Sequence, residues 1–235
     1  LYDFGRQQGG GHLTGRRLTA AQTDAAAEAL AGLCTEAEME RKYGMRGAAP
    51  LLFAVGDGNH SLATAKQCYE NLKKTTPESQ WAGLAARYAL VEVVNNHDGA
   101  LTFEPIHRVV FGVEPEKLLE AFMAYYPGAH EGTGEGHTIA YTYAGHTGFV
   151  TVPRPKVQLA VGTLQAFLDD YVKANGGEVD YIHGDAVTDE LGEKSGNIGF
   201  KLPAMGKEQL FKTVMADGVL PRKTFSMGHA QDKRY

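Results

Sequence analysis

Residues 51–66 read Leu51-Leu52-Phe53-Ala54-Val55-Gly56-Asp57-Gly58-Asn59-His60-Ser61-Leu62-Ala63-Thr64-Ala65-Lys66. The apolar run into Gly56 predicts a buried strand over 51–55 that ends in a tight glycine turn. The polar cluster and alanine-rich run that follow predict a helix over about 61–74. Because a helix start presents unpaired N–H groups and the positive end of the helix dipole, this arrangement predicts an anion site, most commonly for phosphate.

The side chains of the turn suit such a site. Asp57 follows the strand, so we expect its carboxylate at the mouth of the site, where it would ligate nucleotide-bound Mg²⁺ or cap the turn. Gly58 lets the backbone approach a ligand or adopt positive φ. His60 and Ser61 lie in the first helical turn, where an anion would sit. The alternative is a capped turn, in which Asp57 and Asn59 satisfy backbone amides and no ligand binds.

Two common phosphate-binding patterns are excluded at this turn. The Walker A pattern Gly-x-x-x-x-Gly-Lys-Ser/Thr is absent. The dinucleotide pattern Gly-x-Gly-x-x-Gly fails because Ser61 stands where its third glycine would be. The turn therefore predicts an anion site of another type.

The composition is that of a globular chain with a sizeable core. The 235 residues are 43% apolar and 22% charged, with a net charge of -5, which argues against non-specific nucleic-acid binding. Cys34 and Cys68 have no Cys-x-x-Cys partner, so we expect no disulfide framework and a reducing, cytoplasmic location. No apolar run is long enough to span a membrane, and no signal peptide is recognisable. The chain starts at Leu1 rather than Met, so we expect it to lack an N-terminal segment.

Helices and strands alternate along the rest of the chain. We predict helices over 20–33 with Thr19 as N-cap, 36–43, 81–89, 115–125, 163–175 with Thr163 as cap, 185–193 and 207–216. We predict strands over 88–94, 101–103, 179–182 and 198–202, and a β-hairpin between 139–143 and 149–152. This order indicates a mixed α/β or α+β fold.

Two further motifs carry cations beside polar or strand-like residues. His107-Arg108 follows Glu104-Pro105-Ile106, and Arg222-Lys223 precedes Thr224-Phe225-Ser226. Adjacent cations can bind anionic oxygens, so both motifs are candidates to support phosphate binding. The alternatives are a structural histidine and a surface strand.

A metal site is the remaining chemical alternative. None of the nine histidines belongs to a His-x-x-x-His pair or to a cysteine–histidine cluster with zinc spacing. His97-Asp98 is similar to a dyad of some metal hydrolases, which keeps a metal-dependent hydrolase as an alternative function.

Three blocks together resemble the bacterial domain-of-unknown-function 1015 family. They are residues 55–66, 104–110 and 220–228, in order along nearly the whole chain. The resemblance implies one domain over 1–235, with a possible subdivision into a signature-bearing core, 1–112, and a hairpin and helix portion, 113–235. That family in turn resembles the ParB/sulfiredoxin superfamily, which includes free-serine kinases, so it implies an α+β fold with a ParB/sulfiredoxin-like core, an additional mixed sheet and flanking helices.

The resemblance also implies functional residues. Residues 57–61 occupy the place of the superfamily's Asp-Gly-His-His-Arg signature, with Asn59 for the first histidine and Ser61 for the arginine. It implies a small-molecule kinase that uses ATP or ADP with Mg²⁺, with Asp57 and His60 as catalytic residues. The phosphate- or nucleotide-binding candidates are Gly56, Gly58, Asn59, Ser61, Lys66, His107, Arg108, Arg222 and Lys223. A non-catalytic ligand-binding or scaffold protein of the same fold is the alternative, and the expected partner is a small molecule or nucleotide.

Overall fold

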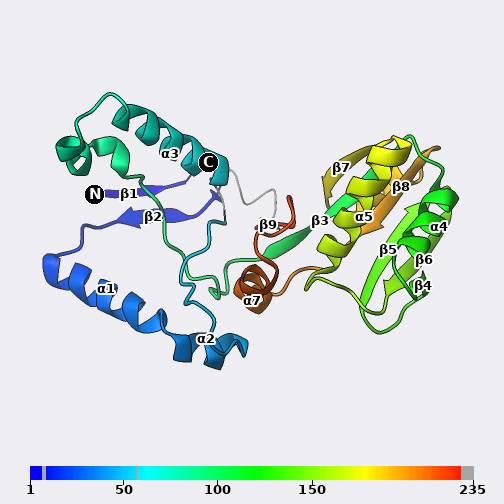
Figure 1. Ribbon diagram of the computed structural model, residues 1–235, viewed down its shortest axis with the longest axis horizontal. Coiled ribbons are helices and arrows are strands. Elements are labelled where there is room, and N and C mark those ends of the chain that lie inside the picture. The colour runs from blue at the N-terminus through cyan, green and yellow to red at the C-terminus, as the bar shows by residue number, and fades with distance from the viewer. Residues whose placement is uncertain (7–8, 57, 229–235) are drawn as a thin grey trace.

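A computed structural model of the chain describes residues 1–6, 9–56 and 58–228 (Figure 1). Its helices are α1 (Ala20–Leu33), α2 (Glu36–Tyr43), α3 (Asn59–Lys73), α4 (Pro115–Tyr125), α5 (Ala160–Asn175), α6 (Asp185–Gly192) and α7 (Lys207–Asp217), with 3-10 helices η2 (Glu78–Gly83) and η3 (Ala85–Arg87). Its strands are β1 (Tyr2–Gly5), β2 (His12–Gly15), β3 (Phe103–Phe111), β4 (His130–Glu131), β5 (His137–Tyr143), β6 (His146–Val152), β7 (Glu178–His183), β8 (Asn197–Lys201) and β9 (Phe225–Met227).

The main sheet has seven strands in the order β4-β6-β5-β8-β3-β7, with β9 paired to β3. The pairings around β3 and β5 are antiparallel. Successive residues of β3 face opposite sides, so Arg108 contacts α5 whereas His107 contacts α6. Helices and an antiparallel sheet in one unit confirm the predicted α+β class.

The buried core belongs to this sheet and its helices. The core cluster begins at Phe103 and includes Phe122 of α4 and Phe167 of α5, whose rings meet edge to face with centroids 5.0 Å apart. On the other face, α6 approaches the sheet closely because both contact positions are glycines. A Cβ added to Gly192 would lie 2.7 Å from the backbone nitrogen of Gly199.

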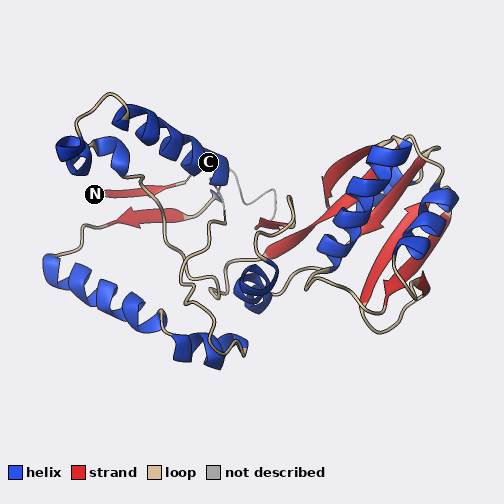
Figure 2. Ribbon diagram, viewed as in Figure 1, coloured by secondary structure: helices blue, strands red, loops and turns tan. Residues whose placement is uncertain are grey.

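The N-terminal part, residues 1–102, comprises α1 to α3, the two 3-10 helices and the strands β1 and β2, which lie apart from the main sheet (Figure 2). Among its described residues only Met39 is buried. Its two strands, β1 and β2, form a separate two-stranded sheet, a unit that is marginal by itself in water. The C-terminal elements contact this part: Tyr43 stacks on Phe211 of α7 at 6.0 Å, and Asn96 Nδ2 donates to the Lys207 carbonyl at 2.9 Å.

Most local predictions agree with the structure. The helices over 20–33, 36–43 and 115–125 are confirmed with the same bounds. The hairpin β5–β6 is confirmed and turns at Ala144-Gly145, where φ is 42° and 79°, as a type I′ turn requires. The structure adds the β1–β2 pair, β4 and β9, none of which was predicted, and its β3 runs from Phe103 to Phe111 where only a short strand over 101–103 was predicted.

Two predicted strands are absent altogether, and of the strand predicted over 101–103 only Phe103 belongs to a strand, β3. Residues 51–55 and 88–94 form no strand, and Phe53 and Leu90 are 56% and 103% exposed. Both segments are apolar, but neither has a neighbouring strand with which to form hydrogen bonds. The cap predicted at Thr163 is also wrong, because α5 begins earlier, at Ala160. The Thr163 hydroxyl instead bonds to the His137 ring at 2.8 Å.

Candidate functional site

The signature turn leads into the N-terminus of α3. Gly58 is the N-cap, with φ 80° and ψ 15°, and has no side-chain cap. This left-handed conformation favours glycine. Asn59, His60 and Ser61 are exposed in the first turn of the helix. Asp57, the predicted catalytic carboxylate, lies outside the described residues.

The turn touches strand β9 through Gly56. A Cβ added to Gly56 would lie 3.1 Å from Met227 Cε and 3.3 Å from its Sδ, which places Gly56 beside the flexible end of the Met227 side chain. Met227 is paired with Phe103 at the start of β3, and the Phe103 and Phe225 rings stack 4.3 Å apart. The structure thus brings the three sequence blocks, 55–66, 104–110 and 220–228, to one place.

Arg108 of β3 bonds to the third sequence block, residues 220–228. It is fully buried. Its Nε donates to Gln165 Oε1 at 2.8 Å and its Nη1 to the Ile106 carbonyl at 2.6 Å. Nη1 also donates to the Lys223 carbonyl at 3.1 Å, and Nη2 to the Arg222 carbonyl at 2.9 Å. The Arg108 guanidinium is therefore bonded to protein groups in this structure, and two of its bonds hold the turn at 221–224 against β3.

Arg108 stays protonated although it is buried. Burial lowers the pKa of Arg108 to about 10, which leaves the group protonated at neutral pH. The guanidinium lies 4.5 Å from the centroid of the Tyr181 ring, a stabilising cation–π contact. A buried cation thus helps to hold β9, and with it Met227, against the signature turn.

Arg222 and Lys223 have exposed side chains at the same turn. Arg222 Nη2 lies 2.7 Å from Asp169 Oδ1, and Gln165 Nε2 donates to the same carboxylate oxygen at 2.8 Å. Lys223 has a positive φ of 53°. These two residues, unlike Arg108, present their cations to solvent. Sequence reasoning missed Gln165, Asp169 and Tyr181, which no recognisable motif contains.

His107 lies on the opposite face of the sheet from Arg108. The Leu202 N–H donates to His107 Nδ1 at 3.1 Å, so Nδ1 is the unprotonated nitrogen and Nε2–H donates to Asp185 Oδ1 at 2.8 Å. Burial lowers the pKa of His107, although its bond to Asp185 opposes the shift. His107 is therefore a buried neutral histidine that ties α6 to β3 and β8.

The remaining candidates lie on or near α3. Lys66 is exposed and lies eight residues beyond Gly58, about 12 Å along the helix axis. Its ammonium reaches the helix start only if its side chain folds back. Its assignment, like those of His60 and the other turn residues, stays a prediction.

The metal alternative gains no support from the described residues. Within them, no three histidine, cysteine or acidic side chains gather where they could hold a metal ion. The Asp98 carboxylate instead accepts the Ala100 N–H at 2.9 Å, which is a turn-forming role. Cys34 and Cys68 are exposed and unpaired. In the described part of the chain, no helix has the length and apolarity that a membrane crossing requires.

Fold and site together define an α+β protein in which a buried arginine of β3 bonds to the turn before β9, and β9 lies beside the glycine turn that precedes α3. The profile of the family described as "Protein of unknown function (DUF1015)" matches residues 1–171, and the chain belongs to that family. The match includes the signature turn and β3, whereas the block at 220–228 lies beyond it. No curated protein matches the chain, and no solved structure matches it.

Proposed function

We propose that this protein binds a nucleotide, through its phosphates, at the N-terminus of α3. The observation that carries the proposal is the helix start itself: Gly58 is its N-cap in the left-handed conformation, and Asn59, His60 and Ser61, which follow, are exposed. The amides of the first turn and the helix dipole favour an anion there. The cysteine count favours a reducing, cytoplasmic setting for such a ligand.

The chemistry that fits this site is phosphoryl transfer to a small molecule. The amides of Gly58–Ser61 and the side chain of His60 would bind phosphate and stabilise charge that develops during transfer. Asp57 would hold Mg²⁺ or orient the acceptor hydroxyl. This assignment follows the resemblance to the free-serine kinases of the ParB/sulfiredoxin superfamily.

Ser61 stands where that superfamily has an arginine, so another cation must complement the phosphates. The Arg108 guanidinium bonds to protein carbonyls, whereas Arg222 and Lys223 are exposed at the turn before β9, where Arg222 also pairs with Asp169. We assign the supporting role to Arg222 and Lys223, with Lys66 as a third contributor. Arg108 then serves by positioning the turn that carries the first two.

The test is thermal unfolding with ATP, ADP or CTP in the presence of Mg²⁺. The proposal predicts that at least one nucleotide raises the melting temperature and that His60→Ala abolishes the rise. His146→Ala, at the exposed start of β6, is the matched control and keeps the rise. No shift with any of the three nucleotides would reject nucleotide binding at this site.

A non-catalytic ligand-binding role is the second candidate. The observation that favours it is Ser61, because the missing arginine removes a bidentate phosphate contact. The two roles differ in turnover: a kinase converts ATP or ADP in the presence of free serine or a related hydroxy compound, and a binding protein does not. Product analysis by phosphorus NMR separates them.

A further inference from the structure

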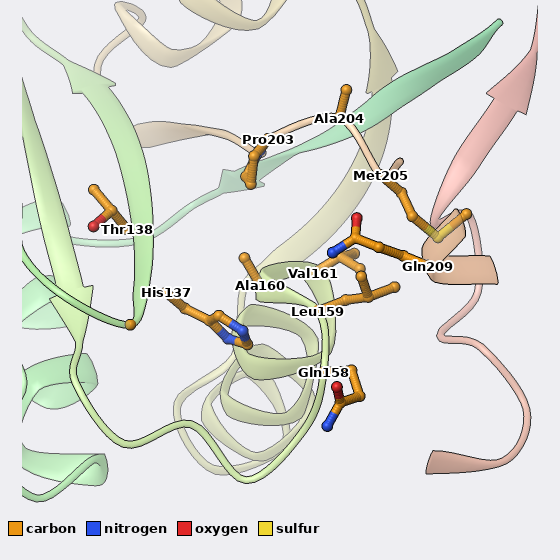
Figure 3. A pocket seen from close by; sticks show the side chains of 11 residues that line it. His137, Thr138, Gln158, Leu159, Ala160, Val161, Pro203, Ala204, Met205 and Gln209 are labelled. Carbon is orange, nitrogen blue, oxygen red and sulfur yellow. The ribbon is translucent and has the colours of Figure 1, made fainter. Parts of the chain in front are cut away.

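A cavity lies within the unit formed by the main sheet and its helices, away from the signature blocks. Its volume is about 320 Å³, and it opens where the starts of β5 and α5 meet the segment between β8 and α7 (Figure 3). None of the candidate residues of the α3 turn lines it. A cavity of this size falls at the lower end of the range for small-molecule sites.

The first turn of α5 lines one wall of this cavity. Ala160 and Val161 are both cavity-lining and are 7% and 6% exposed. Their N-cap residue, Leu159, has no side chain that caps the helix. The next two amides, of Gly162 and Thr163, both donate to the Leu159 carbonyl. The first two amide donors of α5 thus border the cavity without a side-chain cap, at the positive end of the helix.

Gln209 adds a donor from the opposite wall. Its Oε1 accepts the Gly206 N–H at 2.8 Å, which identifies the oxygen and leaves the Nε2 amino group for other partners. In Figure 3 the amide of Gln209 points between Ala204 and Leu159, toward the middle of the cavity. The α7 start therefore contributes a second kind of N–H donor.

His137 is the titratable side chain of the lining. Its Nδ1 lies 2.8 Å from Thr163 Oγ1, which fixes the ring beside the first turn of α5. Burial lowers the pKa of His137, against the opposing effects of the Gln158 backbone and the Asp217 charge. The ring is therefore a neutral polar group near pH 7, and the lining contains no lysine, arginine, aspartate or glutamate.

The N–H donors, the uncharged lining and the apolar wall of the cavity together indicate which class of ligand fits it. The donors suit a carboxylate, while Leu159, Pro203 and Met205 provide an apolar wall. A phosphate dianion would find no cation in the lining. We propose that this cavity binds a small monocarboxylate with a short apolar body, its carboxylate at the start of α5 beside Gln209. The proposal does not depend on nucleotide binding at α3.

The test uses the full chain and hexanoate as the probe, with hexylamine and inorganic phosphate as comparison compounds. Binding is measured by isotope-edited NMR, through the backbone amide shifts of Ala160 and Val161. We expect saturable shifts at these two amides with hexanoate and none with hexylamine or phosphate.

Gln209→Glu is the decisive variant. It keeps an oxygen acceptor for the Gly206 N–H but replaces the cavity-facing amino group with a negatively charged oxygen, so we expect at least tenfold weaker hexanoate binding. Ala216→Glu is the matched control, because it adds the same charge at an exposed position of α7, and it keeps the wild-type affinity. Absence of saturable hexanoate shifts in the wild type, or equal affinity in the Gln209→Glu variant, would overturn the proposal.

Discussion

Replacing Arg108 by methionine should both destabilise the fold and loosen strand β9. The buried guanidinium donates to Gln165 Oε1 and to the carbonyls of Ile106, Arg222 and Lys223. The last two carbonyls belong to a turn with exposed side chains and can regain water. The Gln165 and Ile106 oxygens stay buried, and each unsatisfied buried acceptor costs about 1–3 kcal/mol. We therefore expect a loss of about 3 kcal/mol in the free energy of unfolding.

The assay is urea unfolding followed by far-ultraviolet circular dichroism, with amide hydrogen exchange of residues 225–227 as the local readout. We expect the β9 amides to lose protection by more than the global loss of stability explains, because the turn at 221–224 is released from the sheet. Exchange that changes only in step with global stability would mean that Arg108 does not hold β9.

Arg222→Met is the matched control, since the same substitution there removes an exposed ion pair with Asp169. Exposed pairs of this kind contribute about 0–1 kcal/mol. The reasoning is refuted if the Arg108→Met variant loses less than about 1 kcal/mol, or if both variants lose the same amount.

Two further predictions concern the α6 face of the sheet. Gly192→Ala should lower the free energy of unfolding by about 1–3 kcal/mol through overpacking, because the new Cβ would lie 2.7 Å from backbone atoms of Gly199 and Thr142. The control is Gly32→Ala in α1, where a new Cβ would have nothing within 4 Å and should not destabilise the chain. Urea unfolding measures both variants. The neutral His107 ring predicts that stability falls with acid: its pKa is lower in the folded than in the unfolded state, so the unfolded chain binds more protons below about pH 6.5. Urea midpoints between pH 7.5 and 5.5 should fall less steeply in a His107→Gln variant, and an unchanged slope would contradict this account; some slope remains because the pKa of His137 is lowered too.

Local structure was predictable wherever the chain carries its own stop and start signals. Thr19 caps α1 through a reciprocal bond with Gln22, and Gly145 adopts without strain the positive φ of 79° that the hairpin turn requires. The segments 51–55 and 88–94 have strand-like composition, but a strand exists only if another strand pairs with it. That pairing partner is a property of the whole fold and cannot be read from a short apolar run.

The candidate site was predictable as a set of motifs but not as a set of contacts. The three blocks were recognisable, and the structure joins them through Gly56, Met227 and β3. The role of Arg108 was not predictable, because its partner Gln165 lies 57 residues away on a helix that carries no motif. An arginine beside a histidine looks the same in sequence whether it faces a ligand or a protein carbonyl.

The central claim is that the N-terminus of α3 binds nucleotide phosphates. An amide NMR titration of the full chain with ADP and Mg²⁺ tests it most directly, because the shifts report individual residues of the turn. The account predicts saturable shifts that are largest for the amides of Gly58, Asn59, His60 and Ser61 and that are absent in the His60→Ala variant. Saturable shifts confined to other parts of the chain, or none at all, would contradict it.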